Sequence, residues 1–502
     1  MSETPATFKP TLILHGGAGN LQRDKLPPTL YAKYHASLQS CLRSTHALLK
    51  GGASALDAAV HAVSLMEDDE LFNCGRGSVF TTAGTIEMEA SVMVTTVQEP
   101  DESRPGEMKQ AAAVMGVRNV RHPIQLARES LLRTGYTPDG KPNNDGGSMH
   151  PQLAGPHVET LAREWGLEFK PDEWFWTQRR WDEHRRGLEG KEEPVSLSQG
   201  TVGCVCLDQW GNLAVATSTG GKTNKLPGRI GDTPTLGAGF WAESWDVTPR
   251  RSPLTPKTGP PVVLPRTDGI LTRAVDYING AVVDIAADVH YSLAELKDSL
   301  KSCLAPDLRS SDPPAYSSLP CHPTQASVLV QAPEKTCTGE VHLKYCAVGR
   351  NPVLAKRAIA ISGTGNGDSF LRLAAAHSVA ALAKYRDNSL YTAIHTIAGP
   401  GGELQRSAGP RWGVTGEGEG GFIGINVDTG CLGAATRKLR CGSIVFDFNC
   451  GGMWRAWVEE DGDGKDIEKI MVFREEYKQI ESSAPSTHQD EMVSKAALHQ
   501  TL

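Results

Sequence analysis

Apolar residues recur with a helical period in the first part of the chain. Between Tyr31 and Lys50 they return every three to four residues, which predicts a helix that ends at the glycine pair Gly51 and Gly52. Ser54 with Asp57 three residues later is typical of a second helix start. We expect this second helix to lead into a loop at 66–76.

Strand patterns fill much of the remainder. The segment 85–94 alternates apolar residues with glutamates, which predicts a strand with one buried face, and 111–117 predicts a fully buried strand. The runs 202–207 and 213–217 flank a glycine-containing turn and predict a hairpin. The short apolar run at 11–14 is expected to stop at a glycine-dense turn, 15–19.

Polar segments interrupt these elements and divide the chain. Residues 185–200 are rich in charge and predict a solvated, protease-accessible linker, so that 1–200 and 201–480 form two regions of the chain. A proline-rich run begins an insertion at about 243–357, which we expect to hold a helix at 293–303. The polar tail, 481–502, is expected to be disordered.

Composition indicates a cytoplasmic enzyme for small polar substrates. The chain has 502 residues, 39% of them hydrophobic, and a net charge of -7 with scattered basic residues, which argues against a nucleic-acid partner. It shows no apolar stretch of membrane-spanning length and no signal peptide. Eleven cysteines without metal spacing, with Cys204 and Cys206 two apart on a predicted strand, are expected to be free buried thiols.

The step from Gly200 to Thr201 carries the most specific chemistry. A threonine hydroxyl is a weak nucleophile without a neighbouring base, and cleavage before Thr201 would supply that base as its own α-amino group. Such an amine has a pKa of roughly 7.7 to 8.0, so part of it accepts a proton near neutrality. The sequence therefore predicts a precursor that cuts itself between Gly200 and Thr201.

Several further motifs surround this step. The chain resembles the plant-type asparaginases, or isoaspartyl peptidases, of the N-terminal nucleophile hydrolase superfamily. The motifs that carry the resemblance are His15-Gly16-Gly17-Ala18-Gly19, Phe72-Asn73-Cys74-Gly75-Arg76-Gly77-Ser78, Ile124-Gln125-Leu126-Ala127-Arg128, Thr201 to Gly239, Thr364-Gly365-Asn366-Gly367-Asp368 and Asn449 to Val458. The resemblance implies an α+β protein with a four-layer αββα sandwich.

The resemblance implies roles for three residues around the nucleophile. Thr219 would hydrogen-bond the Thr201 hydroxyl. Arg229 and Asp232 would bind the carboxylate and the ammonium of an amino acid, because a guanidinium fork and a carboxylate match those two charges. Substrates would be L-asparagine, through its side-chain amide, and β-aspartyl peptides.

Thr364 and Gly365 would form the oxyanion site, since a hydroxyl and a backbone N–H can both donate to a developing negative charge. Asn73 would assist maturation or the oxyanion. The loop at 66–76 resembles one that holds a structural sodium ion through backbone carbonyls, with Met66, Glu67, Phe72 and Cys74 as its candidate residues. No other cofactor is expected, and the assembly is expected to be a homodimer of cleaved units.

Three alternatives stay open. The motif that begins at Thr364 is also similar to glycosylasparaginases, which act on glycosylated asparagine. A threonine endopeptidase similar to taspases would share the self-cleavage, although a clamp at Asp232 for a free α-amino group argues against an internal peptide. An unprocessed, inactive homologue would act as a binding protein. The insertion joins the Asp232 loop to the Thr364 loop and is expected near the site entrance.

Overall fold

The computed structural model describes residues 8–98, 110–133, 135, 141, 151–191, 200–247, 355–430 and 439–474. These residues form mixed helices and sheets, as the α+β prediction requires. None of the helices among them is long and apolar enough to cross a membrane. The predicted helix at 293–303, most of the insertion, the end of the linker and the tail at 481–502 all lie outside the described residues.

The larger sheet has eight strands. In spatial order they are β14 (Asp466–Met471), β13 (Gly452–Glu460), β2 (Thr11–Gly19), β6 (Val202–Leu207), β7 (Asn212–Thr219), β3 (Met88–Thr96), β4 (Gln110–Val117) and β5 (Gln152–Ala154). Neighbours are antiparallel except for β4 and β5. The strand that follows Thr201 therefore lies in the middle of the sheet.

The smaller sheet has four antiparallel strands. In spatial order they are β12 (Ser443–Phe448), β10 (Gly420–Asp428), β9 (Ala355–Gly365) and β8 (Phe240–Val247). A short parallel pair, β1 (Phe8–Lys9) with β11 (Arg440–Cys441), stands apart from both sheets. Because β9 ends at Gly365, this sheet delivers the predicted oxyanion residues at one strand end.

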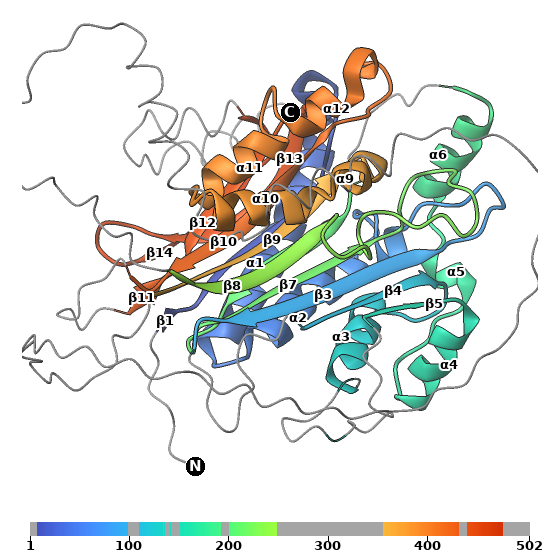
Figure 1. Ribbon diagram of the computed structural model, residues 1–502. Coiled ribbons are helices and arrows are strands. Elements are labelled where there is room, and N and C mark those ends of the chain that lie inside the picture. The colour runs from blue at the N-terminus through green and yellow to red at the C-terminus, as the bar shows by residue number, and fades with distance from the viewer. Residues whose placement is uncertain are drawn as a thin grey trace, which may run out of the picture. The chain divides into compact units, whose positions relative to one another are not determined.

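Helices and short turns connect the strands (Figure 1). Among the described residues, the α-helices are α1 (Pro28–Lys50), α2 (Ala55–Asp68), α3 (Pro123–Arg133), α4 (Pro156–Glu164), α5 (Asp172–Phe175), α6 (Gln178–Leu188), α9 (Gly367–Leu373), α10 (Ala375–Tyr385), α11 (Leu390–Ala398) and α12 (Glu403–Ala408). Three 3₁₀ turns are η1 (Arg23–Lys25), η2 (Gly75–Gly77) and η3 (Gly409–Arg411).

Three groups of buried apolar side chains hold these elements together. One lies between the larger sheet and the helices α1, α2 and α3, where Leu38, Val63 and Leu126 are fully or almost fully buried. A second contains side chains of both sheets, such as Val205 from β6 and Ile423 from β10. A third joins the smaller sheet to α10 and α11, which cover it in Figure 1. Burial of such apolar area is the main source of stability.

Local signals in the sequence set several boundaries correctly. The helix α1 ends at Lys50, and Gly52 behind it has φ of 91°, which a glycine adopts without strain. The hydroxyl of Ser54 accepts the N–H of Asp57 at 3.1 Å, so the predicted helix start is confirmed. The hairpin of β6 and β7 is also confirmed, with Val202 opposite Ser218.

Residues 15–19 do not form the expected turn. They continue β2 as a buried strand, with Gly17 at φ of 116° opposite an irregular step in β13 between Trp454 and Arg455. A side chain at Gly16 would lie 2.6 Å from the ring of Phe72. The glycines therefore serve a distorted strand and close packing rather than a turn, and periodicity cannot separate these two uses.

Two other expectations need correction. The alternation at 85–94 suggested solvent-facing glutamates, but Glu89 on β3 is buried beside the loop at 229–232. The linker at 185–200 is not wholly loop, because α6 continues to Leu188, and Gly200 at its other end is buried. Charge density alone misled in both cases, since a helix face and a buried site can also be charged.

Candidate active site

Thr201 lies immediately before β6, in the centre of the larger sheet. The chain is continuous from Gly200 into Thr201, so its nitrogen is an amide, and the residue is 5% exposed. Its Oγ1 is 2.8 Å from Oγ1 of Thr233. Behind it, His15 Nε2 lies 2.7 Å from the Ser362 hydroxyl, and burial lowers the pKa of His15 to about 3. The imidazole is therefore neutral and links the two sheets beneath Thr201.

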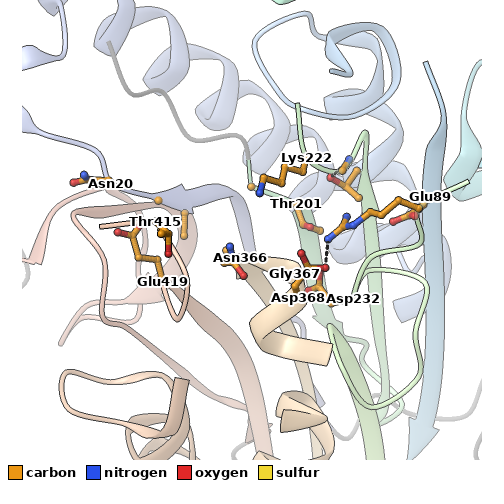
Figure 2. Close-up of a pocket in the computed structure, with 18 of the residues that line it drawn as sticks. Asn20, Glu89, Thr201, Lys222, Asp232, Asn366, Gly367, Asp368, Thr415 and Glu419 are labelled. Carbon is orange, nitrogen blue, oxygen red and sulfur yellow. Dashed lines mark hydrogen bonds and ion pairs between the residues drawn. The ribbon is translucent and has the colours of Figure 1, made fainter. Parts of the chain in front are cut away.

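A pocket of about 370 Å³ opens at Thr201 and gathers most of the predicted site residues (Figure 2). The predicted residues on its wall are Gly200, Thr201, Thr219, Arg229, Asp232 and Gly365. They come from four separate segments of the sequence. Thr364 and Asn73, the remaining predicted residues, lie behind the wall.

Thr219 ends β7 and has a different partner from the one expected. Its hydroxyl accepts the N–H of Gly221 at 3.0 Å, whereas the Thr201 hydroxyl pairs with Thr233. In the uncut chain, Thr219 therefore fixes the turn that follows β7 and does not hydrogen-bond Thr201. Thr233 gave no signal of its own in the sequence, because a single threonine beside Asp232 has no distinguishing pattern.

Asp232 presents an unpaired carboxylate to the pocket. The residue is 5% exposed, and its Oδ2 atom has no hydrogen-bond partner. Burial raises the pKa of Asp232 to about 7, although nearby Arg229 acts in the opposite direction. A Cβ at Gly367 would lie 2.4 Å from Asp232 Oδ1 and 3.2 Å from Arg229 Nη2, so only glycine leaves this space open. The carboxylate is placed to accept a cationic group from a ligand.

Arg229 is held at the same end of the pocket. Its Nη2 donates to Asp368 Oδ1 at 2.8 Å, and Asp368 is largely exposed. A ligand carboxylate could replace Asp368 as the hydrogen-bond acceptor for Arg229, because a guanidinium offers several donors. Arg229 and Asp232 thus place a positive and a negative group side by side, as the clamp prediction requires.

Glu89 is a residue of this wall that sequence reasoning missed. The Gly231 N–H donates to both carboxylate oxygens of Glu89, at 3.0 and 3.2 Å. Gly231 lies between the two clamp residues in the sequence. Burial raises its pKa, and Lys225 and Arg229 act to lower it. Lys225 is itself buried and donates to the Glu87 carbonyl at 2.7 Å. Glu89 therefore fixes the loop that carries Arg229 and Asp232.

Thr364 and Gly365 lie where β9 ends. Thr364 Oγ1 accepts the Ala18 N–H at 3.1 Å, and a Cβ at Gly200 would lie 2.4 Å from that oxygen. Gly365 has φ of 147°, and a Cβ there would lie 2.3 Å from the Glu419 carbonyl. Close contact with the start of β10 therefore requires a glycine at position 365. Thr364 lies directly beside the predicted cleavage point.

Asn73 stabilises the loop before η2. Its Nδ2 donates to the Gly221 carbonyl at 2.7 Å, and its Oδ1 accepts the Val79 N–H at 3.1 Å. The residue is almost completely buried. It therefore connects the 73–79 loop to the turn that follows Thr219, one step away from the pocket.

The predicted sodium loop begins within α2. Met66 and Glu67 belong to that helix, and Phe72 and Cys74 follow it. Glu67 is buried, accepts Ser218 Oγ at 2.6 Å and Ile124 N–H at 3.1 Å, and has a pKa that burial raises well above its ordinary value. The described residues contain no group of three or more His, Cys, Asp or Glu side chains that could hold a metal ion.

Two glycines of this loop pack closely against backbone carbonyls. Side chains at Gly75 and Gly77 would collide with the carbonyl oxygens of Glu67 and Phe72, at 2.1 and 2.0 Å. Carbonyl oxygens are the ligands that a hard cation prefers. The thiol of Cys74 is buried and its pKa is raised, so this side chain is not an ionised ligand.

Comparison with known proteins identifies the family. A family model described as asparaginase matches residues 8–247. The isoaspartyl peptidases of Salmonella typhimurium and Escherichia coli are each 36% identical over 248 residues, which cover 48% of this chain and 71% and 70% of those proteins. The isoaspartyl peptidase/L-asparaginase of Homo sapiens is 34% identical over 241 residues, covering 47% of this chain and 68% of that protein.

The chain belongs to the asparaginase family. The resemblance stated from the motifs is confirmed. In this asparaginase homologue the matched region contains Thr201, Arg229 and Asp232, whereas Thr364 and Gly365 follow residues 248–354. The structure nevertheless brings Gly365 into the same pocket as Thr201.

Proposed function

We propose that this protein hydrolyses the side-chain amide of L-asparagine and the isopeptide bond of β-aspartyl peptides. The observation that carries the proposal is the pocket wall at Thr201, where the Arg229 guanidinium stands beside the unpaired, buried carboxylate of Asp232. An amino acid's α-carboxylate and α-ammonium complement these two groups. With both held there, the β-carboxyl carbon of an aspartyl unit extends toward Thr201.

We also propose the four-layer αββα arrangement of the N-terminal nucleophile hydrolases. Buried side chains shared by both sheets support the inner two layers. Helices α1 to α3 on the larger sheet and α10 and α11 on the smaller support the outer two. This arrangement would explain why strand ends from both sheets, at Thr201 and Gly365, meet at one pocket.

Self-cleavage would prepare the nucleophile. The Thr201 hydroxyl would attack the Gly200 carbonyl carbon, and collapse of the adduct would break the Gly200–Thr201 C–N bond to leave an ester and a free amine. Water would then hydrolyse the ester, which restores the hydroxyl and gives Gly200 a carboxylate. Gly200 suits this step because any side chain would collide with Thr364 and Ala18.

Hydrolysis of substrate would use the same atoms. The freed Thr201 amine would accept the hydroxyl proton as the oxygen attacks the β-carboxyl carbon, and the leaving ammonia or amine would take that proton. Thr364 and the Gly365 N–H would stabilise the oxyanion. Water would release aspartate from the acyl-enzyme, with the same amine as base. The amine supplies the acid–base chemistry, so no cofactor is needed in this scheme.

We further propose that the carbonyls of the 66–74 loop hold a structural sodium ion and that the cleaved units form a homodimer. The close approach of Gly75 to the Glu67 carbonyl and of Gly77 to the Phe72 carbonyl supports the ion site. This ion would stabilise the loop whose Asn73 supports the turn after Thr219, and it would take no part in the reaction.

Intact-mass measurement with activity assays tests the proposal. The wild-type chain is expected to give two fragments with Thr201 as a new N-terminus, and to release ammonia from L-asparagine and leucine from β-aspartyl-leucine. Thr201→Ala should stay uncut and inactive, while Thr201→Ser keeps a hydroxyl and should still cut. Two normal fragments from Thr201→Ala would refute self-cleavage by this residue.

The same assays separate the alternatives. A full-length, inactive wild type would favour a binding protein. Cleavage of internal peptide bonds in a protein substrate would favour a taspase-like endopeptidase. Preferred release from a glycosylated asparagine would favour a glycosylasparaginase.

A further inference from the structure

The pocket extends to both sides of Thr201, and the clamp occupies only one of them. Figure 2 shows Glu89 and Asp232 on one side of Thr201 and Thr415 and Glu419 on the other. The second side also includes Asn20 and the loop at 413–416. The proposed clamp leaves this second side without a role.

The geometry of the proposed reaction assigns that side to the leaving group. If the α-carbon substituents are held at Arg229 and Asp232, the bond that breaks lies at Thr201, between the two sides. The part of a β-aspartyl dipeptide beyond that bond must then point away from Asp232. For L-asparagine this part is only ammonia, so the second side matters for dipeptides alone.

Glu419 is the acidic side chain on this second side. Among the described residues its carboxylate has no hydrogen-bond or ion-pair partner, although the side chain is partly buried. Burial raises its pKa, as expected for a carboxylate without a cation beside it. An unpaired carboxylate that is partly withdrawn from water favours a cationic ligand group.

The backbone that carries Glu419 is firmly anchored. Its carbonyl accepts the Asn366 N–H at 2.8 Å, next to the predicted oxyanion glycine. The preceding Gly418 donates its N–H to Ser369 Oγ at 2.9 Å, and its carbonyl accepts Asn449 Nδ2 at 2.9 Å. The backbone of Glu419 is therefore fixed before a ligand arrives, and a ligand has to order only the side chain.

Lys222 supplies the complementary charge. It lines the pocket, is exposed, and among the described residues forms no ion pair. In Figure 2 it is drawn between Glu419 and Thr201. The residue released from a β-aspartyl dipeptide carries an α-carboxylate close to the scissile bond and its side chain farther away, which matches this order of positive and negative charge.

We propose that Lys222 and Glu419 form a leaving-group subsite that favours β-aspartyl dipeptides whose second residue is lysine or arginine. Lys222 takes the α-carboxylate of that residue, and Glu419 takes its cationic side chain. The inference rests on the proposed function and extends it to a substrate class. Asp232 and Glu419 then bind two separate cations of one dipeptide, on opposite sides of Thr201.

A substrate series tests the subsite in the wild-type enzyme. We compare kcat/KM for β-aspartyl-lysine, β-aspartyl-norleucine and β-aspartyl-glutamate, of which the first two have side chains of similar length. Lysine is expected to be favoured over norleucine by about fivefold to tenfold, and glutamate to be the poorest, in line with the modest value of a partly exposed ion pair. Equal values for lysine and norleucine would overturn the proposal.

Matched variants locate the effect. Glu419→Gln is expected to reduce the preference for lysine over norleucine to about one, whereas Glu403→Gln removes an equal charge outside the pocket and should retain it. Lys222→Met is expected to raise KM for β-aspartyl-lysine more than KM for the same dipeptide with its lysine α-carboxylate replaced by a carboxamide. A preference that persists in Glu419→Gln would refute the role of this carboxylate.

The L-asparagine assay separates this inference from the proposed function. Hydrolysis of L-asparagine without any preference among the dipeptides would overturn the subsite alone. Failure to hydrolyse any of the four substrates would overturn both.

Discussion

Replacing Asp232 by asparagine should stabilise the folded protein while it weakens substrate hydrolysis. The carboxylate is 5% exposed and one of its oxygens has no partner, so its negative charge is costly. Asparagine has nearly the same shape without that charge. Activity and stability should therefore move in opposite directions in Asp232→Asn.

The size of the effect follows from the pKa. Burial raises the pKa of Asp232 to about 7, from an ordinary value of 3.8. Each unit of difference between the folded-state and ordinary pKa corresponds to about 1.36 kcal/mol. The ionised side chain therefore costs at most about 4 kcal/mol once the pH exceeds 7. Because the folded-state pKa is raised, the cost begins near pH 4, grows as pH rises, and is complete above pH 7.

The loss of substrate hydrolysis in Asp232→Asn is expected to have a free-energy cost of similar size. Loss of a buried charge-assisted contact costs roughly 2 to 5 kcal/mol, which is about 30-fold to several thousand-fold in kcat/KM for L-asparagine. Self-cleavage should continue in Asp232→Asn, because the clamp binds substrate and does not hold the Gly200–Thr201 bond.

Chemical denaturation at two pH values tests the stability effect. Both proteins are measured on a Thr201→Ala background, so that each chain is intact as in the structure. The free energy of unfolding of the asparagine variant should exceed that of its parent by about 2 to 3 kcal/mol more at pH 8 than at pH 5. A difference that does not change with pH, or a less stable variant at pH 8, would refute the reasoning.

Other substitutions test the rest of the site. Arg229→Ala should lower kcat/KM for L-asparagine by at least 30-fold while intact-mass spectra still show cleavage; near-normal kcat/KM would reject the clamp. Gly200→Ala should slow self-cleavage at least tenfold, because the new Cβ would lie 2.4 Å from Thr364 Oγ1; Gly462→Ala, where nothing lies within 4 Å, is its control in a time course of the uncut band. Glu89→Gln should raise KM several-fold, since the loop that carries Arg229 and Asp232 loses the carboxylate that accepts the Gly231 N–H; an unchanged KM would contradict this role.

Sequence reasoning succeeded where a short segment determines its own structure. The Ser54 helix start, the glycine end of α1 and the hairpin after Thr201 depend on neighbouring residues, and all are confirmed. The motif that contains Arg229 and Asp232 was also sufficient to predict that both face one pocket. A distinctive motif thus predicted its own part of the site.

It failed where a residue gains its role from distant packing. Glu89 looked like the solvent face of an alternating strand, but it is buried because the loop after β7 covers it. Thr233 pairs with Thr201 only after residues 32 positions apart are brought together. Glu419 had no signal at all, since its interest comes from the pocket and from the lack of a charged partner there.

The long insertion can be tested through its points of attachment. Residues 248–354 connect β8 to β9, and Val247 lies opposite Ala355 in that antiparallel pair, so the chain leaves and re-enters the sheet at adjacent positions. Thr364 lies nine residues farther along β9, which at about 3.3 Å per residue is roughly 30 Å away. The reason for expecting the insertion at the site entrance therefore does not hold.

A deletion variant follows directly from this register. Replacing 248–354 by an Asn-Gly turn should preserve the β8–β9 pair, because a two-residue turn closes adjacent antiparallel strands. We expect self-cleavage to persist and the ratio of kcat/KM for L-asparagine to that for β-aspartyl-leucine to stay within about twofold of the wild-type ratio, since about 30 Å separates the new turn from Thr364. Insoluble or uncut protein would show that the deleted residues complete the fold, and a tenfold change in the ratio would show that they reach the pocket.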